Sequence, residues 1–172
     1  MTSFPVIFIR HAETSPQWSQ PPNSWVLSER GRIQTIKLAT WLHHRFSSIR
    51  PQIYCSTEPK TIQTLAAYAR SLAVQPAPMP QFDEINSHTL PVPDQTQFFA
   101  SRRQIFQQMQ VCPSKISLSN PDQTSSWRSS SLPGPSALYH LLEVLQFLHD
   151  KHSSQPLVIC SHGTILTLYY GY

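Results

Sequence analysis

Residues 6–11 read VIFIRH: four apolar residues, β-branched or aromatic, are followed at once by an arginine and a histidine. A short apolar run of this composition is typical of a strand buried on both faces of a parallel sheet. Similar short runs occupy residues 52–55 and 157–160, and polar residues follow each of them directly. The sequence therefore predicts at least three buried strands, each ending in polar side chains.

Helical segments are expected between these strands. Ser28 has the side chain of a helix N-cap, and a second helix is expected to begin around Ser56-Thr57-Glu58-Pro59, with its proline in the first turn. A third helix is expected over residues 97–109. Two apolar stripes are predicted to face the core: Ile62, Leu65, Ala66, Ala69 and Leu72, and further along Leu138, Leu141, Leu142, Leu145 and Leu148. Strands that alternate with helices predict an α/β fold, a three-layer sandwich with a mostly parallel central sheet and helices on both faces.

Length and composition restrict the class of protein. The 172 residues suit a single domain over 1–172, in which the serine- and proline-rich segment 111–135 is expected to be irregular. Charged residues make up only 13%, and the net charge of +4 is scattered, so nucleic-acid binding is not indicated. Cys55, Cys112 and Cys160 are expected to be reduced core thiols. No segment is long enough to span a membrane, and we expect a cytoplasmic protein.

The polar clusters after the strands carry the chemistry. In a parallel sheet the carboxyl ends of the strands lie at one edge, where ligands bind. Arg10 and His11 after the first strand, Lys60 near the second and His162 after the last should therefore surround one cleft. Two imidazoles, a guanidinium and an ammonium together suit a phosphate group, whereas a histidine that follows a single strand is more often a surface or capping residue.

Four segments, residues 9–14, 27–34, 56–64 and 158–163, keep the order and roughly the spacing of motifs in the histidine phosphatase superfamily, and the chain resembles that family. The resemblance implies phosphoryl transfer in two steps. His11 would attack phosphorus to form a phosphohistidine, which water or an acceptor hydroxyl then attacks. The substrate would be a phosphorylated small molecule or a phosphoprotein. No metal and no cofactor is implied.

The resemblance also implies a role for each matching residue. Arg10, Lys60 and His162 would hold the phosphate, with His162 as the second imidazole of the site. Glu84 is the best match to the acid that protonates the leaving oxygen, and Asp83 is its alternative. The neighbouring residues expected to border the substrate are Thr14, Ser56 and Gly163.

Several positions depart from the family pattern. Ala12 stands where the family usually has glycine, Lys60 where it places an arginine, and Pro135 where it places an acid. Lysine supplies a single hydrated charge where arginine offers a two-pronged fork of donors. The chain also ends nine residues after Gly163, so we expect a last helix of about two turns and a shortened carboxyl-terminal end of the fold.

Alternatives remain for the function of the protein and for the roles of several residues. The hydrolase prediction competes with a non-catalytic phospholigand-binding or regulatory protein and with a phosphoglycerate mutase-type transferase. Trp18 and Trp25 either cover the cleft or cap the core. The pair Arg102-Arg103 is either a solvated edge of its helix or faces the substrate. The histidines at 43–44 and 149–152 are expected to be surface residues, not metal ligands.

Overall fold

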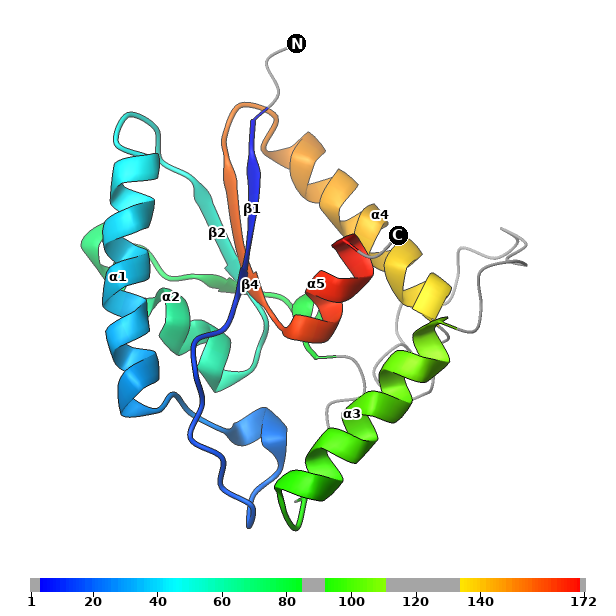
Figure 1. Ribbon diagram of the computed structural model, residues 1–172. Coiled ribbons are helices and arrows are strands. Elements are labelled where there is room, and N and C mark those ends of the chain that lie inside the picture. The colour runs from blue at the N-terminus through cyan, green and yellow to red at the C-terminus, as the bar shows by residue number, and fades with distance from the viewer. Residues whose placement is uncertain (1–3, 85–91, 111–133, 171–172) are drawn as a thin grey trace.

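The computed structural model of the chain describes residues 4–84, 92–110 and 134–170 (Figure 1). The strands are β1 (Val6–Arg10), β2 (Gln52–Cys55), β3 (Ala77–Pro78) and β4 (Leu157–Ser161). The α-helices are α1 (Glu29–Arg45), α2 (Pro59–Ser71), α3 (Gln95–Gln110), α4 (Gly134–Lys151) and α5 (Gly163–Tyr170), and two short 3-10 turns cover Pro22–Ser24 and Pro80–Phe82. Cys112 and most of the segment predicted to be irregular lie outside the described residues.

The four strands form one parallel sheet in the order β1-β4-β2-β3. The register pairs Arg10 with Ser161 and Cys55 with Cys160, so β1, β2 and β4 reach the same edge of the sheet. β3 falls in a proline-rich stretch that sequence analysis treated as a connection. It pairs with β2 over only two residues, too short a segment to produce a periodic pattern.

Helices cover both faces of the sheet, as predicted for an α/β fold. On β4 the side chains alternate: Leu157 and Ile159 join a core with α4, whereas Val158 and Cys160 join a second core with α1 and α2. All five residues of β4 are buried, which explains its unbroken apolar sequence. Cys55 and Cys160 are free thiols buried in the second core, and burial raises the pKa of both, that of Cys55 to about 12.

The first helix is held close to the loop that follows β1. The Ser28 side chain accepts a hydrogen bond from the Gly31 amide at 2.9 Å, as its N-cap position predicted. A β-carbon on Gly31 would lie 2.1 Å from the carbonyl oxygen of Glu13, so only glycine allows this approach. Because the Ser28 amide also donates to that carbonyl at 3.0 Å, the start of α1 fixes the path of the loop.

Three expectations for the helices were wrong in detail. Ile62 and Leu142 are exposed, because the buried face of each helix is narrower than the apolar stripe that its sequence carries. The predicted irregular segment ends sooner than expected, since α4 begins at Gly134 and includes Pro135, a residue that the first turn of a helix tolerates.

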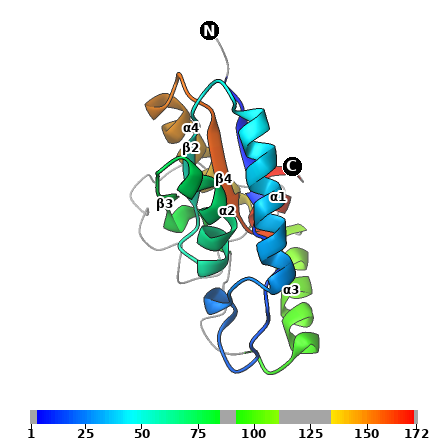
Figure 2. The same ribbon diagram turned by 90° about the vertical axis from the view of Figure 1, so that its left-hand side faces the viewer.

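The carboxyl ends of β1, β2 and β4 point toward the long loop after β1 and toward α3, which lie together below the sheet in Figures 1 and 2. This arrangement leaves a cleft between the strand ends, that loop and α3. Within the described ranges, no helix is long and apolar enough to cross a membrane.

Candidate active site

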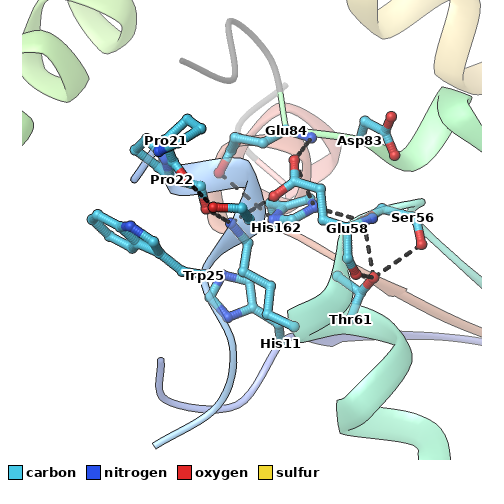
Figure 3. Close-up of polar contacts among 12 residues, drawn as sticks. His11, Pro21, Pro22, Trp25, Ser56, Glu58, Thr61, Asp83, Glu84 and His162 are labelled. Carbon is cyan, nitrogen blue, oxygen red and sulfur yellow. Dashed lines mark hydrogen bonds and ion pairs between the residues drawn. The ribbon is translucent and has the colours of Figure 1, made fainter. Parts of the chain in front are cut away.

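His11 and His162 meet at the carboxyl edge of the sheet. Each follows directly after a strand, β1 and β4, and these two strands are neighbours. Their ring centroids lie 5.2 Å apart with a tilt of 59° between the rings (Figure 3). Two residues separated by 151 positions in the sequence therefore share one site, as the parallel arrangement predicted.

One ring nitrogen of His11 is fixed by the backbone. Nδ1 lies 2.8 Å from the carbonyl oxygen of Ala12. Because a carbonyl oxygen only accepts, Nδ1 carries the proton and Nε2 carries a free electron pair. Burial is the main cause that lowers the pKa of His11 to about 4; the positive charges of Lys60, Arg10 and Arg102 act in the same direction, and the hydrogen bond to Ala12 opposes them. The ring is therefore neutral at pH 7 and is a competent nucleophile.

His162 is fully buried, and a series of hydrogen-bonded hydroxyl groups contacts one nitrogen of its ring. Its Nε2 lies 2.9 Å from Ser56 Oγ, which lies 2.9 Å from Thr61 Oγ1 and accepts from the Glu58 amide at 3.2 Å. Burial lowers the pKa of His162 well below its ordinary value, helped by the positive charge of Lys60. Nδ1 has no hydrogen-bond partner among the described atoms and lies 3.9 Å from Glu84 Oε2. This nitrogen is the atom of the ring that can serve a ligand.

Lys60 is buried beside the site but is held by protein partners. Its ammonium lies 2.6 Å from Glu58 Oε2 and donates to the carbonyl oxygen of Pro22 at 2.8 Å (Figure 3). The side chains of Lys60 and Glu58 are 6% and 5% exposed, so Lys60 is not a solvent-exposed residue of its helix. Burial raises the pKa of Glu58, and the adjacent ammonium opposes that rise. Lys60 therefore supplies positive charge that Glu58 already balances in part.

The two adjacent acids after the Pro80–Phe82 turn have different surroundings. Asp83 accepts from the Thr57 amide at 2.6 Å and from the Thr57 hydroxyl, so its carboxylate ties the loop to the start of α2. Glu84 instead borders the cleft, with Oε2 3.5 Å from the Arg102 guanidinium and with Oε1 buried without a hydrogen bond in the described part of the chain. Of the two acids, Glu84 is the one with an oxygen available to a ligand.

A cleft of about 650 Å³ opens over these groups. Its polar lining includes Arg10, His11, Thr14, Lys60 and Glu84. Gly163 also borders it, and the Arg10 guanidinium lies against this glycine, where a β-carbon would touch it at 3.4 Å. His162 and Ser56 lie beneath the cleft. The structure thus brings the predicted site residues into one region, with Ser56 placed to contact His162 and not the open space.

The deciding comparison is with families of known proteins. The model of the histidine phosphatase superfamily (branch 1) matches residues 6–172. The chain belongs to this superfamily. No curated protein matches it.

Solved structures show the same fold at low sequence identity. YhfR of Bacillus stearothermophilus is 17% identical, with a TM-score of 0.63 over 95% of this chain and 76% of that one. A mutant phosphoserine phosphatase from Entamoeba histolytica, in complex with phosphoserine, gives the same four values. A mycobacterial glucosyl-3-phosphoglycerate phosphatase with bound VO3 is 15% identical, with a TM-score of 0.63 over 94% of this chain and 77% of that one.

Sequence reasoning about this histidine phosphatase superfamily member missed Glu58 as the partner of Lys60 and left Arg102 open. Glu58 was expected only as part of a helix start, and its spacing to Lys60 gives no signal for an ion pair. Arg102 contacts Glu84, and only the packing of α3 over the cleft brings them together. No group of three or more histidine, cysteine or acidic residues that could hold a metal occurs among the described residues.

Proposed function

We propose that the protein hydrolyses a phosphate monoester, from a small metabolite or a phosphoprotein, through a phosphohistidine on His11. The observation that carries the proposal is the pair of neutral imidazoles 5.2 Å apart at the edge of one cleft, with Arg10 and Glu84 beside them. Membership of the histidine phosphatase superfamily supports it, as do the solved phosphatase structures that share its fold.

In the first step, His11 Nε2 attacks the phosphorus atom. The bond from phosphorus to the ester oxygen breaks as the bond to nitrogen forms, and the proton stays on Nδ1, which donates it in a hydrogen bond to the Ala12 carbonyl oxygen. Glu84, in its protonated form, gives a proton to the leaving oxygen. The products are an alcohol or phenol, a phosphorylated His11 and a Glu84 carboxylate.

In the second step, water attacks the phosphohistidine. The Glu84 carboxylate takes a proton from this water, so the acid of the first step becomes the base of the second. The nitrogen–phosphorus bond breaks, inorganic phosphate leaves, and neutral His11 and protonated Glu84 are restored. The cycle consumes one water and needs no other reactant.

Residues around His11 stabilise the negative charge on the phosphate oxygens. Arg10 borders the cleft and can donate two hydrogen bonds from one guanidinium. His162 donates from Nδ1 when the Ser56 hydroxyl donates to Nε2, so Ser56 acts as a positioning residue. Lys60 contributes mainly through its charge, because Glu58 and Pro22 already bind its ammonium. Thr14 and Gly163 border the bound substrate.

The position of Lys60 also favours a second candidate, a phospholigand-binding protein without turnover. An ammonium held 2.6 Å from a carboxylate is less able to stabilise the negative charge that develops during transfer. The pocket would then still bind phosphate through Arg10 and His162. The two candidates differ in a single respect, whether phosphate is released.

The test is the release of inorganic phosphate from a panel of alkyl, sugar and aryl phosphates and of phosphopeptides. Wild-type protein should hydrolyse at least one member of the panel, and the His11→Ala variant should hydrolyse none. If wild type binds a phosphomonoester without releasing phosphate from any, the binding protein is correct. If His11→Ala retains full activity, the proposed nucleophile is wrong.

A further inference from the structure

One side of the cleft is built from aromatic rings. Trp18 and Trp25 come from the loop after β1, and Phe98 and Phe99 come from α3. We call these four residues the aromatic wall. The same cleft is lined by the strand-end wall, defined as Arg10, His11, Lys60 and Glu84 together with His162 beneath them. A substrate whose phosphate contacts the strand-end wall would share the cleft with these rings.

The rings hold one another in fixed contacts. Trp25 lies 5.2 Å from Trp18, with the rings at 88°, and 5.2 Å from Phe98, while Phe98 lies 5.7 Å from Phe99. These centroid distances fall in the range of stabilising aromatic pairs. The aromatic wall is therefore one connected cluster, although it joins two segments about 70 positions apart.

The polar edge of Trp25 is already satisfied by the protein. Trp25 Nε1 donates to the carbonyl oxygens of Gln17 and Gln20 at 3.1 and 3.2 Å, so the Trp25 indole N–H needs no hydrogen-bond acceptor on a ligand. The Arg102 guanidinium lies 5.3 Å from the centre of the Phe98 ring. What the wall offers a ligand is thus apolar ring surface bordered by one cation.

Part of this surface is exposed to solvent. Phe99 is 58% exposed, and Trp18 and Phe98 are half-buried. Covering apolar rings that line a cleft and are open to water with a flat apolar ligand is favourable, because it removes apolar surface from water. A ligand rich in hydroxyl groups would lose hydrogen bonds with water on the same surface.

The aromatic wall is also tied to the reacting groups. The Lys60 ammonium donates to the carbonyl oxygen of Pro22, which belongs to the same loop as Trp18 and Trp25 and also borders the cleft (Figure 3). Trp25 and His11 both line the cleft. The contact between Lys60 and Pro22 thus links the loop that carries two of the rings to the reacting side of the cleft.

We propose that the substrates are aryl phosphates, in which the ring bearing the phosphate packs against Trp18, Phe98 and Phe99. This inference rests on the proposed function and specifies its substrate class. The phosphorus–aryl oxygen bond breaks as the bond to His11 Nε2 forms, and the aryl oxygen leaves with the electron pair, accepting the proton of Glu84. Phenols are far stronger acids than alcohols, so an aryl oxygen needs this proton less than an alkyl oxygen does.

Binding of phosphonates tests the ring contact without turnover. Phenylphosphonate should bind the wild type at least about tenfold more tightly than cyclohexylphosphonate or methylphosphonate. The variants Phe98→Ala and Phe99→Ala should lose most of this preference. The matched control is Phe147→Ala: Phe147 is 59% exposed on α4, lies outside the cleft, and has a cation at 5.9 Å, so its variant should keep the preference.

A second arm separates the two sources of an aryl phosphate. A peptide that contains phosphonomethylphenylalanine is compared with the free amino acid. Binding at least about tenfold tighter for the peptide indicates a phosphotyrosine protein, and equal binding indicates a small aryl phosphate. Either result supports the inference as long as phenylphosphonate is preferred in the first arm.

Failure of this inference and failure of the proposed function have different signatures. Equal binding of phenyl-, cyclohexyl- and methylphosphonate, or no binding of any of them, overturns the aryl substrate class. Phosphate release from alkyl phosphates with His11 dependence would at the same time leave the proposed function intact. Preferred binding of phenylphosphonate without release of phosphate from any monoester would support recognition of an aryl group by the aromatic wall but would overturn both hydrolysis and the assignment of aryl phosphates as substrates.

Discussion

The two walls of the cleft are built on different principles. In the strand-end wall, several polar side chains are held by directed contacts, as when buried His162 is fixed by Ser56 and buried Lys60 by Glu58. In the aromatic wall, rings from a loop and a helix are held by non-directional packing against one another. One wall fixes the positions of reacting atoms, and the other can adapt to the shape of a leaving group.

The difference follows from the elements that carry each wall. Three parallel strands converge at one edge of the sheet, so groups at their ends are placed by the backbone register itself. The loop after β1 and α3 are joined to the sheet by fewer backbone hydrogen bonds. We therefore expect substitutions in the strand-end wall to remove chemistry, and substitutions in the aromatic wall to change selectivity.

The largest expected effect is in the strand-end wall. His11→Ala should lower kcat by at least about 10³-fold on every phosphomonoester, because no other group can form the covalent intermediate. Phosphate release is measured, and His149→Ala serves as the control. His149 is an exposed histidine at the end of α4 and should leave the rate unchanged. Equal losses in both variants would mean that the effect is not specific to the strand-end wall.

The adjacent acids Asp83 and Glu84 should differ in how strongly their substitution lowers kcat. Glu84→Gln should lower kcat by about 10² to 10⁴-fold on an alkyl phosphate, because the leaving oxygen loses its proton donor. The loss should be clearly smaller on an aryl phosphate. Asp83→Asn is the matched control and should cost less than about tenfold, since Asp83 binds Thr57 and not the substrate. A larger loss for Asp83→Asn than for Glu84→Gln would reverse the assignment of the acid.

The buried pair beneath the cleft should dominate the stability of the strand-end wall. Glu58→Ala should lower the free energy of unfolding by about 3–5 kcal/mol, because it leaves the Lys60 ammonium buried without its charge partner. Urea denaturation measures this change, and Glu143→Ala, at an exposed carboxylate, should cost less than about 0.5 kcal/mol. The double variant Glu58→Ala/Lys60→Met should recover much of the loss. A cost below about 1 kcal/mol for Glu58→Ala would show that the pair is not coupled.

His11 should contribute to the pH dependence of stability. The pKa of His11 is about 4 in the folded chain and near 6.5 when unfolded, so the unfolded state binds a proton that the folded state rejects. The contribution of His11 is complete above pH 6.5 and falls by up to about 1.4 kcal/mol per pH unit as the pH drops toward 4. His11→Asn should flatten this dependence, whereas Phe99→Ala should leave its slope unchanged. An unchanged slope in His11→Asn would contradict the lowered pKa.

The strand-end wall could be foreseen from the sequence to a large extent. The apolar runs at residues 6–9 and 157–160 identified strands, and parallel strands bring His11 and His162 to one edge whatever the details of packing. The N-cap at Ser28 and the family motifs added the loop and the second helix. These features depend on local sequence and on a topology that such sequences share.

Features that depend on packing between distant segments could not be foreseen. The path of α3 decides that Arg102 meets Glu84 and that Phe98 meets Trp25, and no periodic pattern encodes that path. The exposure of Ile62 and Leu142 has the same origin, because the width of the buried face depends on what packs against it. Lys60 was expected to face a phosphate, and its contact with Glu58 depends on local geometry at the start of α2.

The most direct test of the central claim is to trap the phosphoryl group on the protein. Wild-type protein is mixed rapidly with a labelled aryl phosphate, quenched in base, in which phosphohistidine survives, and digested for mass spectrometry. The label should appear on the peptide containing His11, at a level that reaches a steady state during turnover, and should be absent from His11→Ala. Label on another residue, or phosphate release with no labelled peptide at any time, would contradict a mechanism through phosphorylated His11.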